Sequence, residues 1–333
     1  MSDFAQAGLI TTLQRLNEGH LGALETELCA SALPIALVLP CYSAELERPA
    51  LAHIVEQLAG ADWLSEIIVS MNGPDPSAQS RASELFSPLP QPVRVLWNEQ
   101  VPTGKGANVA AAFRLLCAEG RAAVLATQDC DVASFQRQDL ARLCYAVTHL
   151  GFSFSKAYYS RVTDRLYGRV TRLFFAPLLH ACVRVLGHQP LLDFLLSFRY
   201  PLAGEIALTR TAAAALPVAN GWGLELGMLC DVFRHLDPRE VCQVGGSSSY
   251  DHKHQPAATA LADMAGEIAA ELFRQLAAEG LPATHDFRAT LATAYRREAE
   301  VALLRSAALA QINGLPFDAK AEREIVEQFA SRL

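Results

Sequence analysis

The sequence predicts an α/β fold in which a mostly parallel, Rossmann-like sheet is followed by a helical C-terminal extension. Four short apolar runs suit buried strands and alternate with segments of helical character: 35–40, 66–71, 93–97 and 122–127. Such alternation is typical of parallel sheets whose strands are connected by helices. From residue 257 almost to the end the pattern is helical, with breaks at the Gly-Leu-Pro segments 280–282 and 314–316.

The remaining elements follow from their local patterns. Amphipathic helices are expected within 3–28, connecting helices over 47–60, 76–87 and 107–119, helices over 140–150 and 165–187, and strands over 202–209 and 241–245. We therefore divide the chain into an N-terminal helical segment (1–30), a Rossmann-like half (31–135), a second half (136–256) and a helical extension (257–333). The Ala-rich extension suggests an appendage or a dimer surface and not a catalytic module.

Composition excludes several classes of protein. The chain has 333 residues, of which 51% are hydrophobic, so it can bury a sizeable core. A net charge of −7 argues against a general nucleic-acid-binding surface. No apolar run reaches the roughly 18 residues that a membrane-spanning helix needs, and the N-terminus lacks the pattern of a secretory signal. Eight cysteines without a CxxC pair are typical of a reducing compartment, so we expect a cytoplasmic protein.

Two acidic residues follow the fourth predicted strand, in Asp129-Cys130-Asp131. Ligands of parallel sheets bind beyond the carboxyl ends of the strands. In extended chain, residues i and i+2 point to one side, so the two carboxylates could form an oxygen site for Mg²⁺ or Mn²⁺ that in turn holds a diphosphate. Taken alone, the motif is equally typical of a turn that caps a helix.

A lysine between two glycines, Gly104-Lys105-Gly106, opens the helix after the third strand. The motif is neither a P-loop nor a dinucleotide fingerprint. A lysine at a helix N-terminus raises the local positive potential, which favours an anion there. An exposed turn lysine is the alternative interpretation.

Residues 156–184 form a basic segment with six Lys or Arg residues against one acid, Asp164. Its Gly168-Arg169-Val170-Thr171 could be an anion site at a helix start, with a guanidinium, a hydroxyl and backbone N–H groups. A solvated helix face or a set of salt-bridge partners is the alternative.

Three further segments combine glycine or polar residues with chemistry-bearing side chains. Glu205 and Glu225 lie beside glycines in apolar surroundings, where buried carboxylates need partners such as sugar hydroxyls or structural salt bridges. His252 and His254 lie in Asp251–Pro256, which is either a metal-ligating loop or a solvated polar loop.

Seven of these motifs, in this order, resemble the glucosyl-3-phosphoglycerate synthases, which are retaining, nucleotide-sugar-dependent glycosyltransferases of the GT-A fold related to the mannosylglycerate synthases. The pieces span about residues 33–256: LVLPCYS, GKGAN, DCD, GRVT, PLAGEIALTR, GWGLELG and DHKHQP. The resemblance implies transfer of glucose from a UDP-glucose-like donor to 3-phosphoglycerate, with Mg²⁺ or Mn²⁺ as cofactor, in a homodimer. It makes 31–135 the nucleotide-sugar-binding half and 136–256 the acceptor-binding half.

The resemblance also implies roles for individual residues. Catalysis would depend on Glu225, Asp131 and Lys105, and Asp131 with His252 would hold the metal. The acceptor would be bound by Gly168, Arg169, Thr171 and His254. The donor would be bound by Pro40, Cys41, Tyr42, Ala44, Asn72, Lys105, Asp129, Cys130, Gly204, Glu205, Trp222 and Glu225.

Two loops differ from the family's pattern, and both fall on recognition of the base. The first reads Pro40-Cys41-Tyr42-Ser43-Ala44-Glu45, where the family usually has P-A-L-N-E-E, and the second is 70–75, where it has D-S-G-S-T-D. Two alternatives therefore stay open. One is transfer to another small acceptor, such as glycerate or a sugar acid, or from a mannosyl donor. The other is a nucleotide-sugar-binding protein without activity.

Overall fold

The computed structural model describes residues 8–17, 21–73, 75–99, 104–217, 221–246, 258–282 and 284–333. Within these residues eight strands form one sheet, in the order β1-β8-β6-β7-β5-β2-β3-β4. The strands are β1 (Thr11–Leu13), β2 (Ile35–Cys41), β3 (Leu64–Met71), β4 (Val93–Trp97), β5 (Val124–Thr127), β6 (Phe154–Tyr158), β7 (Ile206–Thr209) and β8 (Val241–Gly245). Strand β7 runs antiparallel to β5 and β6, whereas the other pairs are parallel. The predicted α/β class with a mostly parallel sheet is confirmed.

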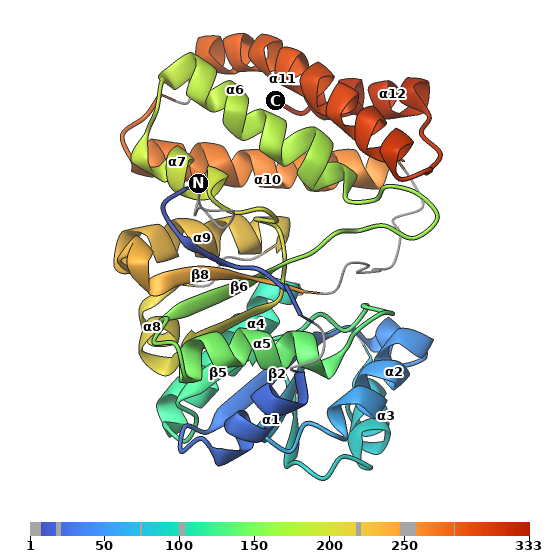
Figure 1. Cartoon of the computed structure of the whole chain (residues 1–333), viewed down its shortest axis with the longest axis vertical. Coiled ribbons are helices and arrows are strands. Elements are labelled where there is room, and N and C mark those ends of the chain that lie inside the picture. The colour runs from blue at the N-terminus through green and yellow to red at the C-terminus, as the bar shows by residue number, and fades with distance from the viewer. Residues whose placement is uncertain are drawn as a thin grey trace.

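The helices divide between the two faces of this sheet and a helical end of the molecule (Figure 1). They are α1 (Leu21–Ala30), α2 (Pro49–Leu58), α3 (Ser77–Phe86), α4 (Lys105–Glu119), α5 (Arg137–Thr148), α6 (Ala176–Leu186), α7 (Pro190–Leu196), α8 (Arg210–Ala215), α9 (Leu224–His235), α10 (Ala258–Ala278), α11 (His285–Ile312) and α12 (Ala319–Ala330). No helix of the described residues is long and apolar enough to cross a membrane.

Strand β2 shows why an unbroken apolar run marks a buried strand here. Alternate residues point to opposite faces of a sheet. Ile35, Leu37 and Leu39 belong to the hydrophobic cluster on one face, and Ala36 and Val38 belong to the cluster on the other. Because both faces are covered, the strand has no polar side, as expected for a parallel sheet between helices.

Two strands were not predicted from the sequence. Thr11–Leu13 lies inside the expected N-terminal helical region but forms β1, which pairs with β8, so the helix prediction is wrong for those residues. The pairing depends on a distant residue, since Gln243 Nε2 donates to Thr12 Oγ1 at 2.9 Å. Strand β6 was missed because Lys156 interrupts its apolar pattern, although this lysine is only 2% exposed.

The helix expected over 165–187 begins later. Val162 and Leu166 form an antiparallel bridge, and Gly168 has a φ of +70°, a conformation that favours glycine. A π-helical stretch (Val170–Phe175) then leads directly into α6. Gly168-Arg169-Val170-Thr171 therefore lies at a helix start. The interpretation of this segment as an anion site requires that position.

The C-terminal extension is not a detached appendage. Helices α10, α11 and α12 gather with α6 at one end of the molecule, away from α1, α2 and α3 (Figure 1). Tyr295 of α11 donates a hydrogen bond to the Leu173 carbonyl at 2.8 Å, and Phe174 packs against the rings of Tyr295 and Phe329. The extension thereby supports the segment that carries Gly168 and Thr171.

Candidate active site

The carboxyl ends of β2, β3 and β5 and the N-terminus of α4 form an edge that is rich in carboxylates. We call it the acidic edge. It comprises four carboxylates and two lysines: Asp129, Asp131, Glu205, Glu225, Lys105 and Lys156. Its wall is fixed by a buried amide network at the end of β3. Asn98 Nδ2 donates to Asn108 Oδ1 at 2.9 Å, and Asn108 Nδ2 donates to Asn72 Oδ1 at 3.3 Å.

Lys105 joins two carboxylates that lie far apart in the sequence. Its Nζ lies 2.6 Å from Asp129 Oδ1 and 2.8 Å from Glu225 Oε1. Burial lowers the pKa of Lys105, but the charges of Asp129 and Glu225 outweigh burial and hold the pKa well above 10.5. The structure thus brings together three of the predicted donor-site residues and keeps a fixed positive charge between two acids.

The loop that contains Gly204 and Glu205 closes over this group. A Cβ atom at Gly204 would lie 2.7 Å from both carboxylate oxygens of Asp129, which explains why the position needs a glycine. Thr127 Oγ1 donates to the Gly204 carbonyl at 2.6 Å, and Tyr159 Oη donates to Glu205 Oε2 at 2.9 Å. The predicted pair Gly204-Glu205 therefore lies at the acidic edge.

Lys156 is a site neighbour that the sequence analysis did not single out. Its Nζ donates to the carbonyl of Ala203, so Lys156 stabilises the loop that contains Gly204 and Glu205. Burial lowers the pKa of Lys156 to about 8, against the opposing charges of Glu225 and Glu205. A lone lysine in the middle of an otherwise apolar strand is the signal that could have identified it.

The first predicted loop follows β2 at the same edge. Pro40 and Cys41 end the strand, and Cys41 is buried against Cys130, which follows β5. The hydrogen bond with Cys41 and burial both raise the pKa of the Cys130 thiol well above 9.0, so Cys130 is an uncharged wall residue. Tyr42 is 42% exposed, and Ala44 is also exposed. All eight cysteines fall in the described residues, and all are free.

Two of the predicted acceptor residues, Gly168 and Thr171, lie beside a cavity of about 430 Å³. We call it the basic cavity, because its wall includes Arg161, Arg172, Arg199 and Arg305. Gly168 and Thr171 line it, whereas Arg169 does not. Tyr159 lines it as well, and since this tyrosine also bonds Glu205, the cavity adjoins the acidic edge.

Arg169 instead forms an ion pair with the C-terminal extension. Its Nε lies 2.7 Å from Glu322 Oε1, and Arg172 Nη2 lies 2.5 Å from Glu322 Oε2. Glu322 is only 4% exposed. One buried carboxylate of α12 therefore holds two guanidinium groups of the predicted acceptor segment, which sequence spacing could not show.

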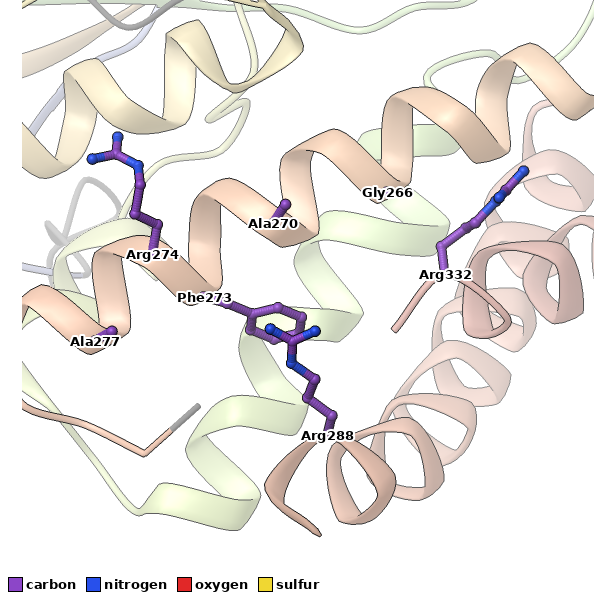
Figure 2. A pocket seen from close by; sticks show the side chains of 7 residues that line it. All are labelled: Gly266, Ala270, Phe273, Arg274, Ala277, Arg288 and Arg332. Atoms are coloured by element: carbon purple, nitrogen blue, oxygen red, sulfur yellow. The ribbon is translucent and has the colours of Figure 1, made fainter. Parts of the chain in front are cut away.

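A second cavity, of about 360 Å³, lies along α10 (Figure 2). Its arginines have partners within the extension. Arg274 Nη2 lies 2.5 Å from Glu271, and Arg332 Nη2 lies 2.6 Å from Asp263. The Arg288 guanidinium stacks over the Phe273 ring with its centre 4.7 Å from the centroid (Figure 2). Each arginine of this cavity thus already has an acidic or aromatic partner among the described residues, which makes the cavity a structural groove.

Three of the predicted site side chains fall outside the part of the chain that the structure describes. His252 and His254 lie outside the described residues, as does the side chain of Trp222. Within the described residues, no group of three or more His, Cys, Asp or Glu side chains has the arrangement of a metal site. The second ligand expected beside Asp131 is His252.

Comparison with known proteins gives a consistent picture. No protein-family model matches the chain. A glucosyl-3-phosphoglycerate synthase from Persephonella marina is 37% identical, over 100% of this chain and 89% of that protein. Another, from Methanococcoides burtonii, is 27% identical, over 89% of this chain and 80% of that protein.

Solved structures agree with these relatives. Glucosyl-3-phosphoglycerate synthase from Mycobacterium tuberculosis in complex with Mn²⁺, UDP-glucose and phosphoglyceric acid has a TM-score of 0.65 to this chain at 26% identity, covering 84% of this chain and 90% of that one. The same enzyme in complex with Mg²⁺ and UDP has a TM-score of 0.62 at 26% identity, covering 83% and 89%.

Proposed function

The chain belongs to the glucosyl-3-phosphoglycerate synthases, and we propose that it transfers glucose from UDP-glucose to 3-phosphoglycerate with the help of a divalent cation. The observation that carries this proposal is the convergence of Lys105, Asp129 and Glu225 from three separate segments on the carboxyl edge of the sheet. Ligands of α/β sheets bind at this edge.

Each of these residues suits one task in glucosyl transfer. In the reaction the bond between glucose C1 and the UDP oxygen breaks, and a new bond forms from C1 to the acceptor hydroxyl oxygen, whose proton is released. Negative charge develops on the diphosphate as it leaves, and the ammonium group of Lys105 can stabilise it. The carboxylate of Glu225 can accept hydrogen bonds from glucose hydroxyls, and Trp222 would lie beside it, as the resemblance implies. Asp129 would face the nucleotide.

The residues expected at the metal suit Mg²⁺ or Mn²⁺. Carboxylate oxygens and a neutral imidazole are accepted ligands of these ions, and Asp131 with His252 would supply them. A cation there would contribute positive charge next to the diphosphate. The net negative charge of the acidic edge supports this assignment, since the carboxylates of Asp129, Glu205 and Glu225 already offset the two lysines and Asp131 adds a further negative charge beside Cys130.

The acceptor would lie in the basic cavity. Gly168 and Thr171 offer backbone N–H groups and a hydroxyl at a helix start, which is a suitable place for a phosphate. Arg169, held by Glu322, would add its charge from behind this site, and His254 would lie nearby. The sheet strands β6, β7 and β8 belong to this acceptor half (136–256), and β2 to β5 belong to the donor half (31–135).

Assembly and compartment complete the proposal. Helix α11 exposes Val301, Leu304, Leu309 and Ile312 by 40%, 64%, 51% and 83%, which supports a homodimer through the extension. Light scattering that gives the mass of a monomer would overturn the dimer. Free cysteines suit a reducing cytoplasm.

The direct test is product analysis. We expect the protein with UDP-glucose, 3-phosphoglycerate and Mn²⁺ to form a product with the mass of glucosyl-3-phosphoglycerate. Retention predicts that the proton at C1 of the product keeps the α-anomeric coupling of the donor in NMR. A protein that binds UDP-glucose but releases no such product with 3-phosphoglycerate would contradict the proposed function.

A further inference from the structure

The basic cavity holds more positive charge than a single phosphate group requires. Four arginines line it, whereas Glu298 is the one carboxylate among its described lining residues. Glu298 is already paired, since Arg184 Nε donates to its Oε1 at 2.8 Å. In the α10 cavity, by contrast, the arginines are satisfied by neighbouring acids or by an aromatic ring. In the basic cavity Arg172 pairs with Glu322 and the Arg199 guanidinium stacks over the Tyr158 ring, but Arg161 and Arg305 have no ion pair among the described residues, so their charge is available to a ligand.

Arg161 has the geometry of a ligand-binding group. Its Cδ lies 3.8 Å from the position that a Cβ atom would take at Gly168, so its side chain passes directly beside the helix start. Its Nε is buried and has no hydrogen-bond partner among the described residues. A buried donor without a partner is costly, and an anion in the cavity would remove that cost.

The wall of the same cavity carries a second group of this kind. Arg172 Nη1 is buried and lacks a hydrogen-bond partner among the described residues, although its Nη2 pairs with Glu322. Arg161, Gly168, Thr171 and Arg172 all line the same cavity, so its wall offers two kinds of anion-binding group, the helix start and the guanidinium of Arg161.

We infer that Arg161 binds the second acidic group of the acceptor, its carboxylate, while the helix start at Gly168 and Thr171 binds the phosphate. The site would then select small phosphorylated acids over phosphate esters that lack a carboxylate. This inference rests on the proposed function, because it concerns the acceptor of the same reaction. It adds a specificity-determining residue that lies outside the four motif positions assigned to the acceptor.

The contact between Tyr159 and Glu205 explains how such binding would serve the reaction. Tyr159 lines the basic cavity and bonds the loop that covers the acidic edge. An acceptor held at both of its charged ends presents the hydroxyl between them in one orientation, toward the donor. Fixed orientation of the reacting groups is a large part of enzymatic rate enhancement.

The test compares Arg161→Gln with the parent protein in two measurements, the KM for 3-phosphoglycerate and the inhibition constant of glycerol 3-phosphate, which lacks the carboxylate. We expect the KM for 3-phosphoglycerate to rise about tenfold or more, as for loss of a charged hydrogen bond. The inhibition constant of glycerol 3-phosphate and the KM for UDP-glucose should change by less than about twofold. Arg165→Gln, at an exposed arginine in the same loop, is the matched control.

Each outcome decides between the two proposals. Equal weakening of 3-phosphoglycerate and glycerol 3-phosphate, or no change in either constant, overturns the role of Arg161 and leaves the proposed function intact. A parent protein that does not glucosylate 3-phosphoglycerate overturns the proposed function itself. If Arg161→Gln does not fold, Arg161→Lys takes its place. We expect Arg161→Lys to keep the inhibition constant of glycerol 3-phosphate and to raise the KM for 3-phosphoglycerate. An unchanged KM for 3-phosphoglycerate in both Arg161→Lys and Arg161→Met would overturn the inference.

Discussion

The acidic edge and the basic cavity adjoin each other but have opposite charge. The edge contains two lysines and four carboxylates, those of Asp129, Asp131, Glu205 and Glu225, which leaves two net negative charges. In the cavity, four arginines and one carboxylate line the wall, and Arg172 is the one of these arginines that pairs with a described carboxylate, Glu322, so the wall keeps a net positive charge. A diphosphate therefore needs a cation to bind at the edge, whereas a phosphorylated acid can bind in the cavity without one.

The largest expected effect is at the edge. Asp131→Ala removes a proposed ligand of the cation, and we expect kcat to fall by about 10²–10³-fold, the loss typical of a group that stabilises the transition state. The measurement is the rate of UDP release over a titration of Mn²⁺. Full activity at low Mn²⁺ would contradict the metal role of Asp131.

A charge buried beneath the edge should affect stability. The pKa of Lys156 in the folded protein, about 8, lies below its unfolded value of 10.5. The unfolded chain then binds more protons between these values, so the free energy of unfolding rises with pH across this window. At 1.36 kcal/mol per pKa unit the rise is about 3 kcal/mol.

Lys156→Met should lack that rise, because it has no group to titrate. Urea unfolding at pH 7.5 and pH 10 for both proteins measures the difference, and the exposed Lys320→Met is the matched control. The same pH slope in the parent and in Lys156→Met would show that Lys156 keeps an ordinary pKa.

Lys105 tests the positive side of the same edge. Lys105→Met removes the ammonium group between Asp129 and Glu225, and we expect kcat to fall by about 10²-fold because charge on the leaving diphosphate is less stabilised. The KM for 3-phosphoglycerate should stay within about twofold, since the acceptor lies in the other region. A rise in that KM with unchanged kcat would place Lys105 on the acceptor side.

The smallest effect is expected from the ion pairs behind the cavity. Glu322→Gln removes the charge that holds Arg169 and Arg172, and we expect a loss of about 2 kcal/mol in the free energy of unfolding. Glu324→Gln, at an exposed position of α12, is the control. Urea unfolding with equal midpoints for the two variants would show that the extension does not stabilise the acceptor segment.

The sequence predicted most strands and the local motifs but not the long-range charge partners. Apolar runs identified β2 to β5, and β2 gives the clearest reason, because burial on both faces leaves it no polar position. Strand β6 was not predicted, because a buried Lys156 is tolerated there only through carboxylates contributed by other segments. The ion pair of Glu322 was not predicted for a similar reason, since Glu322 lies 153 residues from Arg169 along the chain.

The candidate site shows the same division. Glycines next to Lys105 and Glu205 marked positions of close approach that the structure confirms at Gly204. The role of Arg161 depends on a cavity formed between the acceptor loop and α11, and no local pattern reports such a cavity. Residue types thus predicted the chemistry, and only tertiary structure shows which charges remain uncompensated.

The most direct test of the opposite charges is calorimetric binding of UDP and of 3-phosphoglycerate, each with Mn²⁺ and with EDTA. We predict that UDP binds at least about 100-fold more weakly without the metal. The dissociation constant of 3-phosphoglycerate should change by less than about twofold. Metal-independent binding of UDP, or binding of 3-phosphoglycerate that requires Mn²⁺, would contradict the account.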